Sequence, residues 1–193
     1  MQNKHIKEFL NYYIGLPNPQ YAVLLKGKWG SGKTHFINEY KKELDKNKQK
    51  YIYVSLYGVT SYDEIETKFL EAIYPRLYNK KTIFAGKIAK QLLKATLKID
   101  WDGNQQENAE IEVKIPDLKP EDLLNTKDYI LIFDDLERCS INIINLLGYI
   151  NFFVEHQSYK VILIANEEEL EKTDKYTQIK EKLVGKTYEF ISD

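Results

Sequence analysis

The sequence predicts an α/β protein, built as a three-layer α/β/α sandwich around a mostly parallel five-stranded sheet. Apolar runs bounded by turn residues alternate along the chain with segments of helical spacing. Most of these runs are continuously apolar, which is typical of parallel strands covered on both faces. A glycine-rich pattern, GKWGSGKT at residues 27–34, lies between the first run and a helical segment. Because parallel strands need crossover connections, this alternation favours helices on both faces of one sheet.

Length and composition limit the class of protein further. A chain of 193 residues can bury a substantial core as one domain, and a net charge of -1 makes no overall case for nucleic acid. The single Cys139 excludes an internal disulfide. No run reaches the roughly 18–20 apolar residues that cross a bilayer, and the polar N-terminus does not resemble a signal peptide. We therefore expect a cytoplasmic protein.

The first half of the chain reads as alternating helices and strands. Gly15 and the following prolines end the first helix, and Ser61 with Glu64 forms a capping box for the third. The expected elements are a helix at Lys4–Ile14, a strand at Tyr21–Lys26, a helix at His35–Lys46, a strand at Tyr51–Tyr57 and a helix from Ser61 towards Tyr74.

The middle of the chain, at about residues 79–120, is predicted to be an insertion in a single domain spanning 1–193. Residues 79–98 place lysines around an apolar stripe of helical spacing, and 100–117 form an acidic hairpin or loose segment. The basic helix at 80–98 could lie on an anionic membrane surface or contact nucleic acid. Packing of the stripe on the core, with the lysines in water, is favoured over both.

Regular spacing returns in the last third. The expected elements are a strand at Tyr129–Phe133, a helix at Ile141–Glu155, a strand at Lys160–Ala165, a helix at Tyr176–Val184 closed by Gly185, and a fifth strand at Lys186–Ile191.

The pattern G-x-x-x-x-G-K-[ST] is matched by Gly27, Gly32, Lys33 and Thr34. Glycines allow successive backbone N–H groups to surround phosphate oxygens, and the helix that follows adds its positive dipole end. Lys33 should reach the β- and γ-phosphates, and the Thr34 hydroxyl should bind Mg²⁺. The residues expected to contact the nucleotide are Gly27, Trp29, Gly30, Ser31, Gly32, Lys33, Thr34 and His35.

Acidic residues follow the predicted strand at Tyr129–Phe133, in the form of a Walker B segment. Asp134 is expected to hold Mg²⁺ directly or through a water, and Asp135 is expected to orient the attacking water. Glu137 is a nearby substitute for Asp135. The alternative, in which Asp135 is simply a solvated acid in a turn, remains open.

Asn166 follows the next predicted strand. It could hydrogen-bond the attacking water or the γ-phosphate as a sensor, or it could cap the turn at Glu167–Leu170. Both readings remain open. The candidate catalytic set is therefore Lys33, Asp134, Asp135 and Asn166.

Several of these segments together resemble the KAP family of P-loop NTPases. They are GKWGSGKT at 27–34, FDDLERC at 133–139, VILIANEEEL at 161–170 and KLVGKTYEFISD at 182–193. Trp29 inside the loop and the Asp-Asp-x-x-Arg step ending at Arg138 make the likeness more specific than a phosphate loop alone. The resemblance covers most of the chain except roughly residues 79–120.

The resemblance implies an ATPase core with strand order 5-1-4-3-2 that uses ATP with Mg²⁺. It also implies membrane-associated signalling or, in bacteria, exclusion of phage and other mobile elements. Many family members carry transmembrane helices between the two motifs, whereas this chain has the basic stretch. The chain ends after the predicted fifth strand, where relatives continue into a helical lid and effector regions. We expect an N-terminal ATPase domain lacking those regions, with slow hydrolysis.

The main hypothesis is a nucleoside triphosphatase whose hydrolysis drives a conformational or assembly switch. Its expected partners are ATP and either further copies of itself or a C-terminal effector region. The alternative is a regulatory module that binds nucleotide and hydrolyses little or none; a small-molecule kinase is a weaker third reading. ATP is favoured over GTP because Asn47-Lys48-Gln49-Lys50 lacks the aspartate of a guanine signature.

Overall fold

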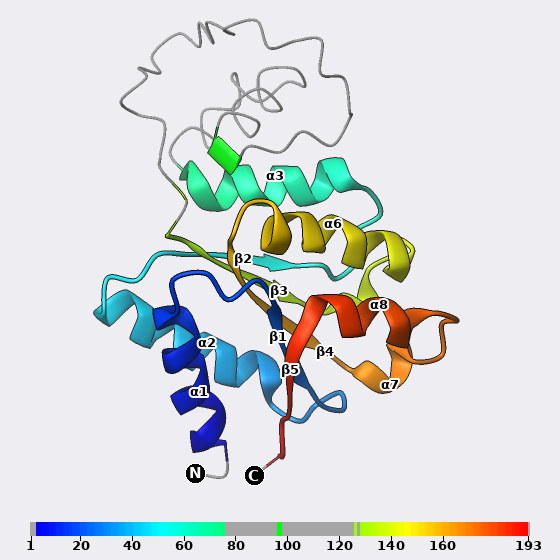
Figure 1. Ribbon diagram of the computed structural model, residues 1–193, viewed down its shortest axis with the longest axis horizontal. Helices are drawn as coiled ribbons and strands as arrows, with labels where there is room; N and C mark the ends of the chain where they lie inside the picture. Colours follow the sequence, from blue (N-terminus) through cyan, green and yellow to red (C-terminus); the bar gives the residue numbers. More distant parts are fainter. Residues whose placement is uncertain (1–2, 76–95, 98–125, 127, 193) are drawn as a thin grey trace, which may run out of the picture. The chain divides into compact units, whose positions relative to one another are not determined.

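A computed structural model describes residues 3–75, 96–97, 126 and 128–192 of the protein (Figure 1). The chain divides into two compact units. The first comprises Met1–Ser61 and Lys127–Asp193, and the second comprises Tyr62–Thr126. The predicted basic helix and acidic segment of the middle region lie outside the described residues, apart from Thr96 and Leu97.

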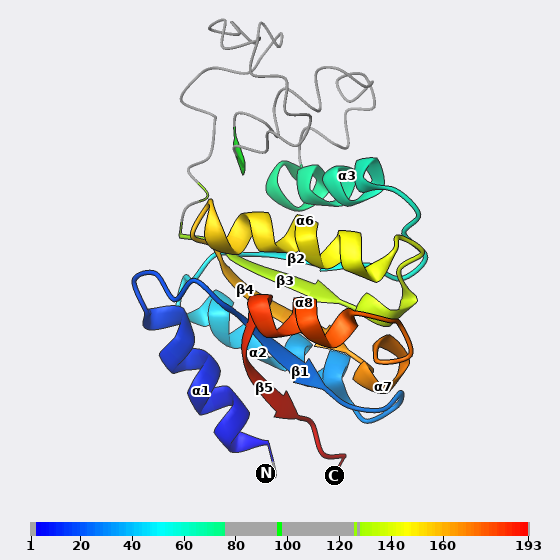
Figure 2. The same ribbon diagram turned by 45° about the vertical axis from the view of Figure 1, so that its right-hand side comes forward.

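The first unit is built on a five-stranded sheet whose strands are all parallel. The strand order is β2-β3-β4-β1-β5 (Figure 2), which is the expected order 5-1-4-3-2 viewed from the other edge. The strands are β1 (Ala22–Lys26), β2 (Tyr51–Ser55), β3 (Ile130–Asp134), β4 (Lys160–Ala165) and β5 (Val184–Glu189). The predicted α/β fold is therefore confirmed. Because the strands are parallel, the carboxyl ends of β1 and β3 lie at the same end of the sheet, on either side of β4.

Helices cover both faces of this sheet (Figures 1 and 2). The helices on one face are α1 (Lys4–Gly15) and α2 (Lys33–Lys46), and those on the other are α6 (Ile143–Glu155) and α8 (Tyr176–Leu183). Two short helices lie in the loops, η3 (Leu136–Arg138), a 3₁₀ turn, and α7 (Glu167–Leu170). The three layers bury the apolar residues of β1, β3 and β4, which explains their continuous apolar runs.

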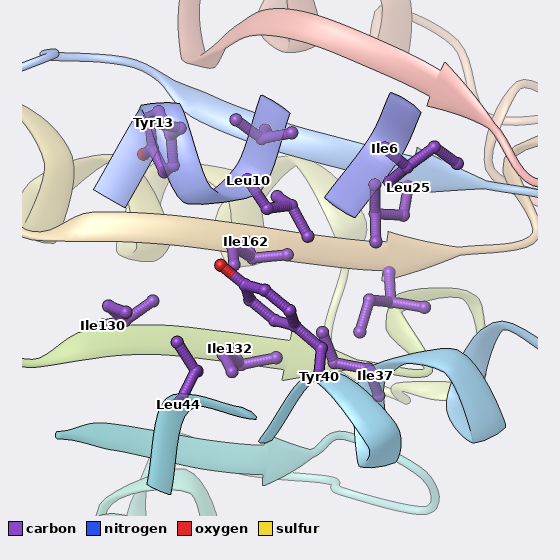
Figure 3. Close-up of a cluster of buried hydrophobic side chains, with 12 residues drawn as sticks. Ile6, Leu10, Tyr13, Leu25, Ile37, Tyr40, Leu44, Ile130, Ile132 and Ile162 are labelled. Atoms are coloured by element: carbon purple, nitrogen blue, oxygen red, sulfur yellow. The ribbon is translucent and has the colours of Figure 1, made fainter. Parts of the chain in front are cut away.

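One half of the core lies between the sheet and the helices α1 and α2 (Figure 3). Tyr13 is the largest residue that α1 contributes to it. Its hydroxyl donates to the carbonyl of Tyr21 at 2.7 Å and accepts from the N–H of Val161 at 2.9 Å, so the buried polar atom has partners. This contact fastens α1 to the sheet beside β1 and β4.

The other half of the core lies under α6. The rings of Phe133 on β3 and Phe153 on α6 are 6.4 Å apart, a spacing at which aromatic rings attract. Helix α6 begins at Ile143 rather than at the predicted Ile141. The side chain of Asn142 accepts from the backbone N–H of Ile144 at 3.0 Å, which fixes the start of the helix.

Strand β5 begins earlier than its pattern indicates. Gly185 was expected to close the preceding helix, but it lies inside β5 and the helix ends at Leu183. A Cβ atom at Gly185 would lie 2.5 Å from Cγ of Tyr21, so the Tyr21 ring occupies the place of a side chain. The glycine is therefore required by close packing and not by a helix cap.

The second unit is described only in part. Its helix α3 (Tyr62–Ile73) buries Ile65, Phe69 and Leu70. Tyr74 and Thr96 share a hydrogen bond of 2.9 Å between their hydroxyls, and Thr126 donates to the carbonyl of Thr96 at 2.9 Å. Leu97, a member of the predicted apolar stripe, is buried. Among the residues described in both units, no helix is long and apolar enough to cross a membrane.

A buried ion cluster fixes the turn after β4. Glu167 is 3% exposed, and its carboxylate lies 3.2 Å from Lys26 Nζ and 2.5 Å from Lys180 Nζ. Burial alone would raise the pKa of Glu167, but the two lysines outweigh it and the pKa is lowered. The hydroxyl of Tyr176 donates a further hydrogen bond at 3.2 Å. The cluster joins β1, α7 and α8.

The substitution Glu167→Gln should lower the free energy of unfolding by about 1–3 kcal/mol near pH 7, because it removes charged hydrogen bonds from a buried site. A lowered carboxyl pKa stabilises the fold above the unfolded-state value and loses that effect as the pH falls through the folded-state value. The difference from the parent should therefore shrink below about pH 4. Urea unfolding at several pH values measures it.

The matched control is Glu168→Gln. Glu168 is the adjacent residue, and its ion pair with Lys28 is exposed on both sides. Such pairs contribute about 0–1 kcal/mol, so this variant should unfold like the parent. Equal effects of the two substitutions at pH 7 would contradict the role assigned to the buried cluster.

Candidate functional site

The glycine-rich loop at 27–34 lies where the sequence predicts it, between β1 and α2. The N–H of Gly27 donates to the carbonyl of Ala165 at 3.1 Å, which ties the start of the loop to the end of β4. Gly30 and Gly32 have φ angles of 75° and 96°, in the left-handed region that side chains disfavour. Gly32 is the N-cap of α2 and has no side chain with which to cap the first N–H groups of the helix.

The loop packs closely on the segment that follows β5. A Cβ atom at Gly27 would lie 3.0 Å from the Ser31 hydroxyl and 3.1 Å from the carbonyl oxygen of Phe190. The Phe190 ring lies below Gly32, 3.5 Å from the place of a Cβ atom there. The N–H of Phe190 donates to the carbonyl of Lys26 at 2.7 Å. Gly27 and Gly32 are thus held against Phe190.

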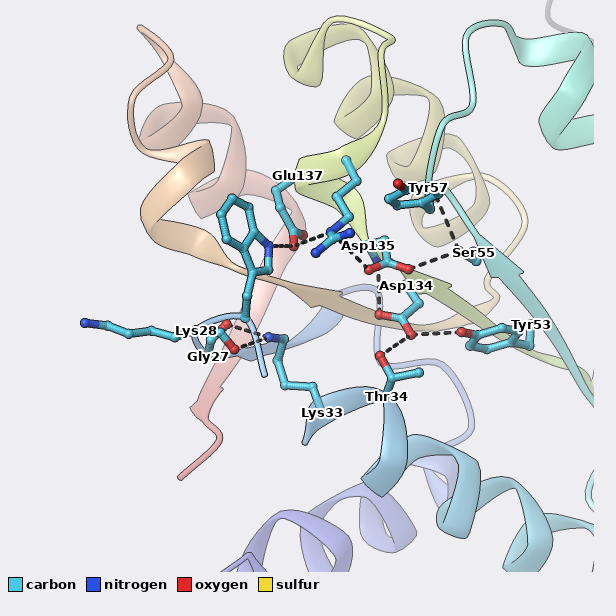
Figure 4. A network of polar contacts seen from close by, with 12 residues as sticks. Gly27, Lys28, Lys33, Thr34, Tyr53, Ser55, Tyr57, Asp134, Asp135 and Glu137 are labelled. Atoms are coloured by element: carbon cyan, nitrogen blue, oxygen red, sulfur yellow. Dashed lines mark hydrogen bonds and ion pairs between the residues drawn. The ribbon is translucent and has the colours of Figure 1, made fainter. Parts of the chain in front are cut away.

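Lys33 is the first residue of α2 and is 8% exposed. Its ammonium donates to the carbonyls of Gly27 at 2.5 Å and Lys28 at 2.9 Å (Figure 4). Burial lowers the pKa of Lys33, while the carboxylates of Glu137, Asp134 and Asp135 oppose that shift. The lysine therefore lies at the mouth of the loop among acidic neighbours.

Asp134 ends β3 and is 1% exposed. Its Oδ2 accepts from the Thr34 hydroxyl at 3.1 Å and from the Tyr53 hydroxyl at 2.8 Å (Figure 4). Its Oδ1 accepts from the N–H of Asp135 at 2.8 Å. Burial is the main cause that raises the pKa of Asp134, and these hydrogen bonds moderate the rise. The structure thus joins the predicted metal ligands Thr34 and Asp134 directly.

Asp135 reverses the chain after β3. Its φ and ψ angles are 59° and 41°, a left-handed conformation that aspartate tolerates better than most residues. This single residue allows η3 to begin at once, a turn that the sequence pattern did not predict. The Asp135 carboxylate accepts from the Ser55 hydroxyl at 3.0 Å.

Glu137 is the more enclosed of the two later acids, with a side chain that is 2% exposed. Its Oε1 accepts from the indole N–H of Trp29 at 2.7 Å, which connects the glycine-rich loop to η3 (Figure 4). Its Oε2 is buried and has no hydrogen-bond partner within the part of the chain that the structure describes. A buried carboxylate oxygen without a partner is costly and is typical of functional sites.

These side chains surround a cavity of about 250 Å³. The residues that line it are Trp29, Gly30, Gly32, Lys33, Thr34, His35, Asp134, Asp135, Glu137, Arg138 and Ala165. Six of the eight expected nucleotide-contacting residues are in this lining, while Gly27 and Ser31 lie behind it in the loop. The loop, the end of β3 and η3 therefore meet at one place.

Asn166 lies in a neighbouring hollow with Lys26, Gly27 and Lys28 rather than in the lining of this cavity. It occupies the N-cap position of α7, yet its side chain makes no capping hydrogen bond. The structure therefore gives no support to the capping alternative, and the sensor role stays a prediction.

Three residues of the site were not predicted from the sequence, namely Tyr53, Ser55 and Tyr57. Tyr53 and Ser55 alternate with the buried Ile52 and Val54 along β2. Strand β2 pairs with β3 so that Ser55 lies opposite Asp134. The alternation could have indicated two polar side chains on one face, but only the strand order shows that this face adjoins Asp134.

A phosphate loop between β1 and α2, with an acid at the end of β3 beyond the intervening β4, defines a P-loop NTPase. Comparison with protein families matches residues 3–190 to the KAP family P-loop domain. The chain therefore belongs to the KAP family of P-loop NTPases, as its motifs indicated, and is a nucleotide-binding NTPase domain. Among curated proteins, none matches the sequence significantly.

Among solved structures, the chain is similar to the crystal structure of Cdc6p from Pyrobaculum aerophilum, with a TM-score of 0.55 and 16% sequence identity. The match covers 98% of this chain and 44% of the Cdc6p chain, so this chain spans less than half the length of that protein. At this identity the likeness shows the fold alone.

The substitution Asp134→Asn should raise the melting temperature of the nucleotide-free protein at pH 7 by about 2–4 °C, the shift that ~1 kcal/mol produces in a chain of this size. The pKa of Asp134 is raised in the folded state, so its ionised form costs stability above that pKa. The gain should vanish as the pH falls below about 4, where the aspartate is protonated in both states. The asparagine carbonyl oxygen can still accept from both hydroxyls, although its NH₂ group then faces the N–H of Asp135 and loses that bond.

Calorimetry of Asp134→Asn beside Asp128→Asn tests this expectation. Asp128 is an exposed carboxylate at the opposite end of β3, and its replacement should leave the melting temperature within about 1–2 °C. A lower melting temperature for Asp134→Asn at pH 7 would show that the carboxylate stabilises the fold without ligand.

Proposed function

We propose that this domain is a Mg²⁺-dependent ATPase. The observation that carries the proposal is the 3.1 Å hydrogen bond between the Thr34 hydroxyl and the Asp134 carboxylate. It brings the hydroxyl of a phosphate loop and a strand-end acid together, although β4 separates their strands in the sheet. A site that only bound phosphate would not need the second group.

The triphosphate would lie along the loop at 27–34. The left-handed Gly30 and Gly32 support a tight backbone turn, and the uncapped start of α2 supports anion binding. Lys33 would exchange its bonds to the Gly27 and Lys28 carbonyls for bonds to β- and γ-phosphate oxygens. Trp29 and His35 would contribute to the outer wall of the site.

Thr34 and Asp134 would hold the metal. A hydroxyl and a carboxylate are hard oxygen donors of the kind that Mg²⁺ prefers, and Mg²⁺ usually takes its remaining ligands from phosphates and water. A bound metal ion would neutralise the negative charge that develops on the phosphates. The raised pKa of Asp134 supports this assignment, because a cation beside the carboxylate would offset the cost of its burial.

Two acids are candidates for orienting the attacking water. Asp135, the first choice from the sequence, has one oxygen bonded to Ser55 and the other facing Arg138. Glu137 has a buried Oε2 without a partner among the described residues and lines the same cavity. The contacts favour Glu137 for this role, with Asp135 as its neighbour. Asn166 would act as a sensor only if nucleotide draws it towards the γ-phosphate.

ATP is the proposed nucleotide because the chain lacks a guanine signature and resembles ATPases in its motifs. We further propose that hydrolysis changes the conformation or assembly of the protein through self-association or an effector region. A role in phage defence or signalling, at a membrane surface or in the cytoplasm, rests on family membership. A binding module with little hydrolysis is the alternative, and the same experiment distinguishes it.

Phosphate release from MgATP and MgGTP tests the proposal. We expect release from ATP in the parent protein, and Lys33→Ala should reduce it about 10²-fold or more, because it removes charged bonds to phosphate. Glu137→Gln should reduce turnover about 10²–10⁴-fold with nucleotide binding retained, and Asp135→Asn should reduce it less. The exposed Glu8→Gln on α1 is the control and should match the parent.

The outcomes separate the readings. If the parent binds MgATP but releases no phosphate, the domain is a binding module and not an ATPase. If Asp135→Asn loses far more turnover than Glu137→Gln, the water is oriented by Asp135. Calorimetric titration of each variant with a non-hydrolysed ATP analogue separates lost binding from lost turnover.

A further inference from the structure

Arg138 lines the cavity, and the acids paired with its charge among the described residues are 3.8 Å and 3.9 Å away. It ends η3, four residues after Asp134, and lines the cavity together with Lys33 and Thr34. The chain has one other arginine, Arg76, which lies outside the described residues. Arg138 is therefore the one arginine among the described residues, and it lies at the site.

Two aromatic rings hold the Arg138 side chain. Its guanidinium carbon lies 5.3 Å from the centre of the Trp29 ring and 5.1 Å from that of the Tyr57 ring. Both distances are within the range of cation–π attraction. Trp29 belongs to the glycine-rich loop, and Tyr57 belongs to the segment after β2. The Arg138 guanidinium therefore contacts aromatic rings from two separate segments.

The backbone around Arg138 is also fixed. The N–H of Gly58 donates to the Arg138 carbonyl at 3.1 Å, and the N–H of Ser140 donates to the Val59 carbonyl at 2.8 Å. These bonds attach the segment that carries Tyr57 to η3. The N–H of Leu56 donates to the Asp134 carbonyl at 2.8 Å, so main-chain bonds on both sides of Tyr57 place its ring beside the guanidinium.

The acids near Arg138 do not form close pairs with it. Arg138 Nε lies 3.8 Å from Asp135 Oδ1 and 3.9 Å from Glu137 Oε1, both longer than a hydrogen bond. The Glu137 oxygen in question accepts from Trp29 instead, at 2.7 Å. Stacking on rings leaves the in-plane N–H groups of a guanidinium able to bind an anion.

The charge of Arg138 reaches the phosphate loop. Burial is the main cause that lowers the pKa of Lys33, and the positive charge of Arg138 adds to it. Two cations around one cavity repel each other, and a polyanion between them would relieve that repulsion. A triphosphate carries one phosphate more than a diphosphate, and the cavity beside Lys33 is also lined by Arg138.

We propose that Arg138 binds the terminal phosphate of the nucleotide in cis and so distinguishes a triphosphate from a diphosphate, with Trp29 and Tyr57 as positioning residues. The proposal rests on the nucleotide site of the proposed function. It requires no second subunit for this charge. After loss of the terminal phosphate, Arg138 would again have Asp135 and Glu137 as its neighbouring anions among the described residues.

Calorimetric titration of the full chain with Mg²⁺ and either ATPγS or ADP tests the proposal. Arg138→Ala should weaken ATPγS binding about 10–100-fold and ADP binding by less than about 3-fold, since one set of charged hydrogen bonds to the terminal phosphate is lost. Arg138→Gln keeps much of the side-chain length and should show the same pattern. Lys42→Ala removes one charge from an exposed position on α2 and should change neither affinity.

Variants of the two rings test the positioning role. Tyr57→Phe keeps the ring and should keep the ratio of ATPγS to ADP affinity, whereas Tyr57→Ala should reduce it about 2–5-fold, as expected for one cation–π contact. Trp29→Phe keeps a ring but loses the hydrogen bond to Glu137, and it should keep the ratio, whereas Trp29→Ala should reduce it. A merely structural role of Tyr57 would alter the melting temperature and leave this ratio unchanged.

The results assign failure to one proposal or the other. If Arg138→Ala and Arg138→Gln keep the parent ratio, or weaken both nucleotides equally, Arg138 does not read the terminal phosphate and this inference is overturned. If the parent binds neither nucleotide, the nucleotide site itself fails and the inference fails with it. If Lys33→Ala binds both as the parent does, the site has been misplaced.

Discussion

The arrangement of the site depends on the hydrogen bonds that the buried carboxylate of Asp134 accepts. Thr34, Tyr53 and the N–H of Asp135 donate to it, so α2, β2 and η3 are all fastened to the end of β3. Strands β1 and β3 are not neighbours in the sheet, and β4 pairs with both of them. The bond between Thr34 and Asp134 adds a direct link from α2 to the end of β3. A buried acid is unfavourable without partners, and here its partners come from each element that the site must align.

Much of the fold follows from local pattern, and its exceptions have non-local causes. The central strands are continuous apolar runs, and the phosphate loop identifies β1 and α2 with little ambiguity. The start of β5 could not be predicted, because Gly185 is needed only where the Tyr21 ring crosses it. Likewise η3 depends on one left-handed residue, Asp135, which leaves no periodic signal. A residue pattern describes one segment of the chain. The start of β5 and the turn at η3 depend instead on contacts between segments.

The candidate site shows the same division. Spacing identified Lys33, Thr34 and Asp134, because a phosphate loop and a strand-end acid are each local patterns. The ring of Tyr57 and the hydroxyls on β2 have no motif of their own, and they enter the site through the strand order and through hydrogen bonds to η3. The relative merits of Asp135 and Glu137 likewise depend on which oxygen is already bonded, a property that residue order does not contain.

The contact between Phe190 and the glycine-rich loop gives the domain a mechanical property. Gly27 and Gly32 rest on Phe190, whose N–H is bonded to Lys26, and the next residue, Ile191, exchanges two hydrogen bonds with the Asn3 side chain. Tension applied to the backbone beyond β5 would therefore load the floor of the phosphate loop before it reached the central strands. The floor of the phosphate loop, the end of β5 and Asn3 near the N-terminus are thus joined by one continuous set of contacts.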